Sequence, residues 1–196
     1  MNIKYPNGKK VSNNKITHIN SRGMLFESEL NIANEYYRTN NLAIIYKKPT
    51  PIQVVKVSYP ERSKAKIVEA YYKTPSTTDY NGIYKTKYID FEAKQTDNAS
   101  FSFKHIFAHQ IIHLKKIDEQ GGIAFVIIYF KILNQVFIID IKDFYREYTN
   151  NLHDGPKSIK ACNITNIGGV EVLLNKLPIV DYLKAVDSLY FNQKSK

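Results

Sequence analysis

The chain has 196 residues and a mass of 22.7 kDa, enough for one domain with a substantial hydrophobic core. Its formal net charge is +10, and 43% of its residues are apolar, which is typical of a globular protein. The longest apolar run, residues 123–130, is far shorter than the roughly 20 residues of a membrane span, and no secretory signal opens the sequence. The single cysteine, Cys162, excludes an intramolecular disulfide, so we expect a cytoplasmic protein.

The first residues are basic and lack apolar periodicity. Residues 1–23 contain five basic and no acidic side chains, which predicts a flexible basic arm over residues 1–21. Apolar residues at helical spacing then predict a helix over residues 22–38, capped by Ser21. The apolar run at residues 42–46 predicts a short strand.

A basic segment follows this strand. Residues 47–73 carry seven basic and two acidic side chains, with three tyrosines between them. Two prolines, at 49 and 51, interrupt the chain after this strand. We expect residues 49–72 to project from the core as a stalk, extended over 54–59 and helical over 63–72. Positive charge beside aromatic rings suits nucleic acid, and a solvated lysine-rich surface is the alternative.

The second half of the chain alternates between strand and helix patterns. Tyr80-Asn81-Gly82 predicts a turn before a strictly alternating strand over residues 86–94. The pattern then predicts a helix over 105–119 ended by Gly121-Gly122, strands over 123–130 and 136–141, a short helix over 142–148, a loop over 150–169 and a last helix over 178–190. This alternation predicts a single α/β or α+β domain, a sheet with helices packed on it.

The most informative polar pattern is Asp79 followed by Glu92-Ala93-Lys94. Glu92 and Lys94 lie two residues apart on the alternating strand, so both side chains project from one face. If Asp79 lies on a neighbouring strand or turn, two carboxylates converge and suit Mg²⁺ or Mn²⁺. A lysine beside them stabilises the negative charge that develops at an attacked phosphate, as in PD-(D/E)xK nucleases. A surface ion pair on a strand is the alternative explanation.

Three histidines form a competing pattern. His105, His109 and His113 recur every four residues and would share one face of a helix. Two histidines at this spacing bind zinc in zincins, but the glutamate of that motif is missing and three in-line histidines cannot close a tetrahedral shell. We therefore expect these histidines to belong to a polar surface of the helix, or to lie near a bound phosphate.

Taken together, these motifs resemble those of the RecU-type Holliday junction resolvases, which belong to the PD-(D/E)xK nuclease superfamily. The resemblance covers nearly the whole chain. It depends on seven ordered segments: residues 5–9 (YPNGK), 21–24 (SRGM), 47–51 (KKPTP), 76–84 (STTDYNGIY), 88–94 (YIDFEAK), 109–110 (HQ) and 125–127 (FVI).

The resemblance implies a restriction-endonuclease-like fold, with a mixed central sheet flanked by helices and a protruding basic stalk. It implies an Mg²⁺-dependent endonuclease, with Mn²⁺ as a substitute, that leaves 5′-phosphate ends. Its metal ligands correspond to Thr77, Asp79, Glu92 and Gln110, and its transition-state lysine to Lys94.

The resemblance also implies partners. A homodimer would make paired symmetric nicks in four-way junction DNA, with the stalk entering the open centre of the junction, during recombination and recombinational repair. A RecA-type recombinase and a branch-migration helicase are further expected partners. A junction-binding protein that modulates a recombinase, and a nuclease for other branched DNA, remain alternatives. We expect DNA contacts at six side chains: Arg22, Lys56, Arg62, Lys64, Lys66 and Tyr80.

Overall fold

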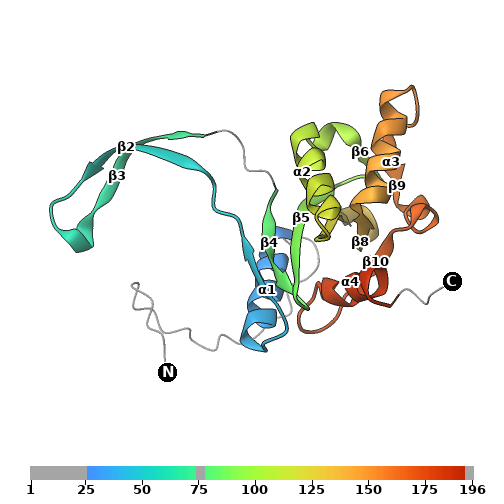
Figure 1. The fold of residues 1–196 in the computed structure, drawn as a ribbon, viewed down its shortest axis with the longest axis horizontal. Coiled ribbons are helices and arrows are strands. Elements are labelled where there is room, and N and C mark those ends of the chain that lie inside the picture. The colour runs from blue at the N-terminus through green and yellow to red at the C-terminus, as the bar shows by residue number, and fades with distance from the viewer. Residues whose placement is uncertain (1–25, 74–77, 193–196) are drawn as a thin grey trace.

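The computed structural model describes residues 26–73 and 78–192, apart from the side chain of Arg62. The expected basic arm therefore lies outside the described residues, as do Arg22 and Thr77. Among the described residues, six strands form one mixed sheet in the order β1-β4-β5-β7-β8-β10 (Figure 1). These strands are β1 (Ile44–Lys47), β4 (Tyr80–Tyr84), β5 (Lys87–Thr96), β7 (Ile123–Phe130), β8 (Gln135–Asp140) and β10 (Val170–Val172). The β5–β7 pair is parallel, and the other four pairs are antiparallel.

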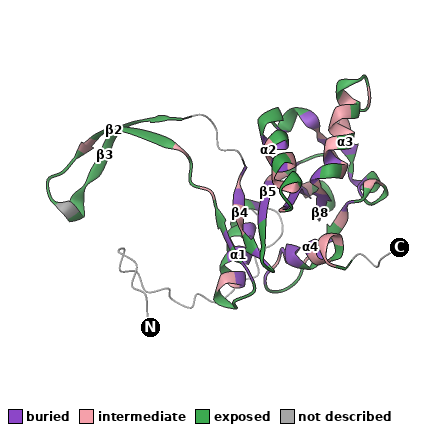
Figure 2. Ribbon diagram, viewed as in Figure 1, coloured by how far each residue is buried: buried purple, intermediate pink, exposed green. Residues whose placement is uncertain are grey.

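Helices cover both faces of this sheet. They are α1 (Phe26–Thr39), α2 (Ala108–Glu119), α3 (Ile141–Leu152) and α4 (Tyr182–Tyr190). Leu30 of α1 and Tyr182 of α4 belong to one buried cluster, and Ile111 of α2 and Phe144 of α3 belong to the other. Figure 2 shows the buried residues concentrated in this three-layer core. The arrangement confirms the expected α/β class with a mixed central sheet flanked by helices.

Short elements complete the described chain. Two short strands, β6 (Ser100–Ser102) and β9 (Ser158–Lys160), pair with each other outside the main sheet. The residues expected as a loop over 150–169 thus include a strand, as well as two 3₁₀ turns. The last helix begins at Tyr182 rather than at Pro178. In the described residues, we find no helix that is long and apolar enough to cross a membrane.

The stalk is a two-stranded antiparallel ribbon formed by β2 (Ile52–Ser58) and β3 (Lys66–Tyr72). It extends away from the core, and a 3₁₀ turn, η1 (Arg62–Lys64), joins its strands at the far end (Figure 1). The helix expected over residues 63–72 is therefore wrong. All seven residues of β3 are exposed, so no core face selects a helical period, and pairing with β2 determines the conformation.

Strands β4 and β5 form a tight hairpin. Its turn is at Lys85 and Thr86, which both have positive φ angles of 44° and 66°. The turn expected at residues 80–82 is therefore wrong, because these residues are part of β4. Gly82 faces Ile45 of β1, and a Cβ there would lie 1.9 Å from a backbone oxygen of β1. Here glycine permits close approach of two strands rather than a turn.

Candidate active site

The register of the β4–β5 hairpin brings Asp79 next to Glu92. Tyr80 pairs with Phe91, so Asp79, one residue before Tyr80, comes opposite Glu92 at the open end of the hairpin. A carboxylate oxygen of Asp79, Oδ2, accepts a hydrogen bond from the backbone amide of Ala93 at 3.0 Å. The 13-residue separation in sequence is thus the geometry of a hairpin with a two-residue turn.

Glu92 is a buried carboxylate with one engaged oxygen. Its exposure is only 1%, and Oε1 accepts hydrogen bonds from Lys94 Nζ at 2.6 Å and from Gln110 Nε2 at 2.7 Å. Among the described residues, Oε2 has no hydrogen-bond partner although it is buried. An acceptor oxygen in this state is costly unless a proton or a cation occupies it.

The surroundings of Glu92 favour its neutral form in the absence of a cation. Burial and the negative charge of Asp79 raise the pKa of Glu92 to about 7, although the neighbouring Lys94 ammonium lowers it. A buried carboxylate whose charge is disfavoured by a neighbouring carboxylate forms, with that neighbour, a site that a divalent cation would stabilise.

Gln110 holds Glu92 from helix α2. Its side-chain oxygen, Oε1, accepts a hydrogen bond from the backbone amide of Phe107 at 3.1 Å, while its Nε2 donates to Glu92. Gln110 therefore links the start of α2 to the carboxylate. Gln110 is expected as a metal ligand. In this geometry its side-chain oxygen accepts the hydrogen bond from Phe107, and its side-chain NH₂ group orients Glu92.

A hollow of about 240 Å³ opens beside these residues. Its lining consists of Phe26, Glu27, Asp79, Tyr80, Ala93, Lys94 and Gln95. Glu27, from the first turn of α1, is the second carboxylate residue of this lining beside Asp79, and it forms an ion pair with Lys47 of β1. The sequence leaves open whether Glu27 lies near the site or only pairs with a neighbouring cation, and it does not predict Lys47 as a site residue. The only sequence signal for Glu27 is its place in the first turn of an amphipathic helix, which does not reveal the strand end that faces it.

Tyr80 differs from its expected role. Its side chain is fully buried, and its ring stacks on Phe91 with centroids 4.9 Å apart. Its hydroxyl donates to Asn31 Oδ1 at 3.1 Å. The expectation that this ring contacts DNA is therefore corrected, since the aromatic face is used by the core.

The histidines do not form a metal site in this structure. Among the described residues, no three His, Cys, Asp or Glu side chains are grouped so as to hold a metal ion. His105 lies in the short 3₁₀ element η2 (Phe103–His105), before α2 begins, and its ring packs edge-on against Phe101. His109 stacks on Phe107, and His113 Nε2 lies 3.3 Å from Asp90 Oδ2.

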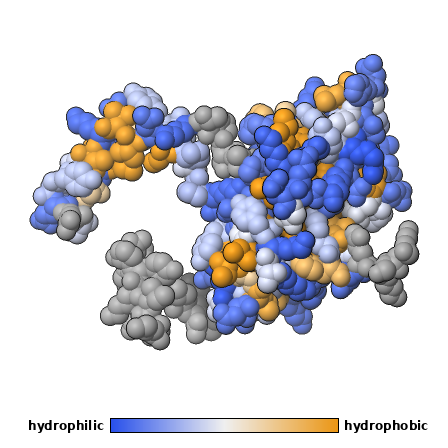
Figure 3. Space-filling model, viewed as in Figure 1, coloured by the Kyte–Doolittle hydropathy of each residue, from blue (hydrophilic) through white to orange (hydrophobic). Residues whose placement is uncertain are grey.

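The expected contacts between the stalk and DNA stay predictions, but the structure locates the residues that would make them. Lys56, Lys64 and Lys66 are exposed on the ribbon, and Lys64 pairs with Glu61 at 2.9 Å. Arg62 lies in η1 at the far end. Figure 3 shows apolar side chains gathered on the same ribbon between hydrophilic ones. The exposed apolar residues of the ribbon include Ile52, Val54, Val55, Ile67 and Val68.

Comparison with known proteins shows the family of this chain. A family model described as Recombination protein U, RecU, matches residues 21–188. The chain belongs to the RecU family. Proteins named Holliday junction resolvase RecU from Bacillus thuringiensis, Bacillus cereus and Bacillus anthracis are each 44% identical to it, over 98% of this chain and 100% of theirs. The expected resemblance is thereby confirmed.

A solved structure is also similar to this RecU-family chain. It is that of Hjc, a Holliday junction resolvase from the archaeal hyperthermophile Archaeoglobus fulgidus. The match covers 76% of this chain and 96% of that one, with a TM-score of 0.44 and 12% sequence identity.

Proposed function

We propose that this RecU-family protein is a Holliday junction resolvase, an endonuclease that makes paired symmetric nicks in four-way DNA junctions during recombination and recombinational repair. The names of its curated relatives support this activity. The observation that carries the proposal is the convergence of Asp79, Glu92 and Lys94 at the open end of one hairpin. Glu92 and Lys94 lie on β5, and a strand holds side chains more accurately than a loop.

The chain offers a fitting site for a divalent metal ion, with Mg²⁺ as the expected ion and Mn²⁺ as a substitute. Two carboxylates converge, and one Glu92 oxygen is buried without a hydrogen-bond partner among the described residues. Carboxylate oxygens are the ligands that Mg²⁺ prefers. Asp79 and Glu92 would hold the ion, and Thr77, outside the described residues, is proposed as a further ligand. When bound, the ion polarises the phosphate and makes a water molecule more acidic.

The residues of the chain would supply the remaining chemistry. Lys94 projects from the same strand face as Glu92 and is only partly exposed, so its charge is poorly screened. We propose that the Lys94 ammonium stabilises the negative charge that develops on the attacked phosphate. Gln110 keeps Glu92 in one rotamer by donating to Oε1. Hydrolysis of the bond to the 3′ oxygen leaves a 5′-phosphate and a 3′-hydroxyl.

Two nicks at symmetric positions require two sites, so we propose a homodimer with C2 symmetry. The exposed lysines of the stalk, together with Arg62 and the basic residue Arg22, would contact phosphates and make binding dependent on salt. A recombinase of the RecA type and a branch-migration helicase remain proposed partners.

The test is cleavage of a labelled four-way junction in the presence of Mg²⁺, with the parent chain, Glu92→Ala and Lys94→Ala. Linear duplexes of matched sequence serve as control substrates. We expect paired symmetric nicks in junctions alone, 5′-phosphate ends, and a loss of at least about 10²-fold in both variants.

Two other results would each replace the proposal. Tight junction binding without cleavage, in either Mg²⁺ or Mn²⁺, would indicate a junction-binding protein that modulates recombination. Equal cleavage of duplexes, flaps and junctions would indicate a nuclease of the same superfamily with a broader target.

A further inference from the structure

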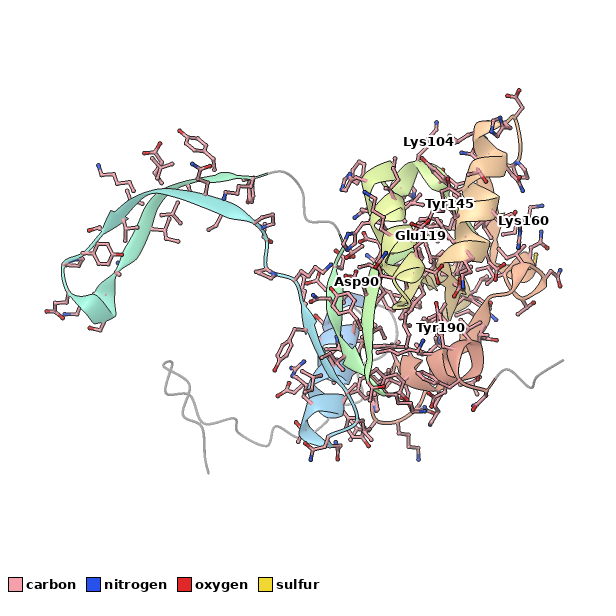
Figure 4. The ribbon with its side chains drawn as sticks, viewed as in Figure 1. Asp90, Lys104, Glu119, Tyr145, Lys160 and Tyr190 are labelled. Atoms are coloured by element: carbon pink, nitrogen blue, oxygen red, sulfur yellow. The ribbon has the colours of Figure 1, made fainter. Side chains whose placement is uncertain are left out.

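Asp90 is a buried acidic residue outside the site described above. It lies on β5 two residues before Glu92, on the same strand face, and its exposure is 0%. Figure 4 labels it beside β4 and β5, near the part of the core from which the stalk departs. A fully buried carboxylate needs partners for its charge, and Asp90 has four among the residues that the structure describes.

Two of these partners come from the connections between core and stalk. Lys48 follows the last residue of β1 on the outgoing connection, and its Nζ donates to Asp90 Oδ2 at 2.8 Å. Thr78 lies on the returning connection, and its hydroxyl donates to the other oxygen, Oδ1. Lys48 Nζ also donates to the Thr78 hydroxyl. One carboxylate thus holds both connections of the stalk together.

The same contacts reach the catalytic pair. Thr78 immediately precedes Asp79, and the backbone amide of Lys48 donates to the backbone oxygen of Asp79 at 2.7 Å. A shift of either connection would therefore displace Asp79 relative to Glu92.

The other two partners attach this network to the core. Tyr88, on the same strand face, donates its hydroxyl to Asp90 Oδ2 at 3.0 Å. His113 of α2 lies 3.3 Å from the same oxygen, one helical turn after Gln110. Helix α2 therefore contacts two successive residues of the polar face of β5, Glu92 through Gln110 and Asp90 through His113.

We propose that Asp90 is a positioning residue, which fixes the base of the stalk to the catalytic strand so that a junction engaged by the stalk meets Asp79 and Glu92 in a constant register. The inference rests on the proposed function. A buried ion pair often adds little to stability compared with apolar residues, and its better-attested role is to specify one arrangement. Here the arrangement specified is that of the two stalk connections and strand β5.

The first test measures distance and requires no cleavage. One spin label is attached to the natural Cys162, which is exposed on the surface of the main body of the protein. A second is attached to Ser63→Cys in η1, at the far end of the stalk. Labelled chain is diluted into excess unlabelled chain, so that only distances within one chain are detected. We expect Asp90→Asn and Thr78→Val to broaden the distance distribution, because each removes a bond between stalk and strand.

Matched variants make this test specific. Thr78→Ser retains the hydroxyl and should keep the narrow distribution of the parent. Asp187→Asn, at a half-buried position of α4 where the carboxylate pairs with Lys85, is the control for an Asp-to-Asn change and should also keep the narrow distribution. If Asp90→Asn does not fold, the comparison of Thr78→Val with Thr78→Ser decides. Unchanged distributions in the folded Asp90 and Thr78 variants would overturn the inference.

The second test uses a junction substrate. We expect Asp90→Asn to scatter the nicks over several phosphates and to lower cleavage at the parent position by about 10²-fold, as misplacement of reacting groups does. A uniform loss at unchanged positions would overturn the inference, since a fold or site defect alone gives that result. If the parent chain cuts no junction, the proposed function fails, while the distance test still judges the role of Asp90.

Discussion

At the scale of single residues, Glu92 affects how the free energy of unfolding depends on pH. Its pKa is raised to about 7 by burial and by the charge of Asp79, from an ordinary value of 4.5. Between these two values the folded chain binds a proton that the unfolded chain releases, so the free energy of unfolding falls as the pH rises through this range. The site is thus built at a cost in stability.

Replacing Glu92 with Gln removes this cost, because the neutral amide keeps an oxygen for the hydrogen bond from Gln110. Without divalent metal, we expect Glu92→Gln to exceed the parent in free energy of unfolding by about 3 kcal/mol at pH 8. The advantage should shrink towards zero near pH 4.5, the ordinary value of this group. Urea unfolding at a series of pH values measures the difference. Glu171→Gln, at an exposed position, is the matched control and should show no such trend. A constant offset at every pH would contradict the prediction.

The residues of the site differ in how far the sequence reveals them. The sequence predicts that Glu92 and Lys94 share one face, because side chains on a strand alternate with a period of two. The 13-residue separation between Asp79 and Glu92 fits a hairpin. The contact between Gln110 and Glu92 and the network around Asp90 depend on tertiary packing, which no local pattern encodes. The same is true of the burial of Tyr80 against Phe91.

At the scale of secondary structure, the β4–β5 turn determines the register that joins the two carboxylates. Lys85 and Thr86 both adopt positive φ angles, which suit glycine and asparagine and strain a β-branched residue. We expect Thr86→Gly to raise the free energy of unfolding by about 0.5 to 1 kcal/mol, after the extra entropy of the unfolded glycine is deducted. Thermal unfolding should show an increase in Tm of about 2 °C.

Thr86→Ala is the control for this prediction, since it removes the side-chain hydroxyl and the branch but keeps the Cβ. It should gain clearly less than the glycine variant. An equal gain would show that the hydroxyl or the branch, rather than the left-handed backbone, is the source of strain.

The stalk explains why one element was predicted wrongly. Residues 66–72 contain Ile, Val and two Tyr, which favour strands, yet their spacing also permits a helix. Periodicity identifies an element by the face it buries, and here every residue of β3 is exposed. In the core, where β5, α2 and β7 bury clear faces, the expected elements agree with the structure to within a few residues.

At the scale of the whole molecule, the ribbon that projects from the core carries exposed positive charge far from Asp79 and Glu92 (Figure 1). If Lys56 and Lys66 each contact one phosphate, Lys56→Gln with Lys66→Gln should flatten the plot of log binding constant against log salt concentration by about 1.8. Junction binding is measured by titration without divalent metal, so that no DNA is cut.

Lys184→Gln controls for the loss of charge alone, because this exposed lysine lies on α4 and pairs with Asp181. Its salt dependence should equal that of the parent. A double stalk variant with an unchanged slope would indicate that these two lysines remain solvated when DNA is bound.

The central strand β7 has a consequence for how the molecule opens. All eight of its residues are buried, and they alternate between the two clusters, with Phe125 and Ile127 in one and Val126 and Ile128 in the other. If either layer of helices separates from the sheet, one face of β7 is exposed, and the opposite face of the same strand is part of the other cluster. Backbone amides of β7 should therefore exchange with deuterium only through global unfolding, whereas those of β2 and β3 exchange through local opening of the ribbon. Because the β4–β5 hairpin pairs directly with β7 through β5, we expect its amides to share the slow exchange of the core.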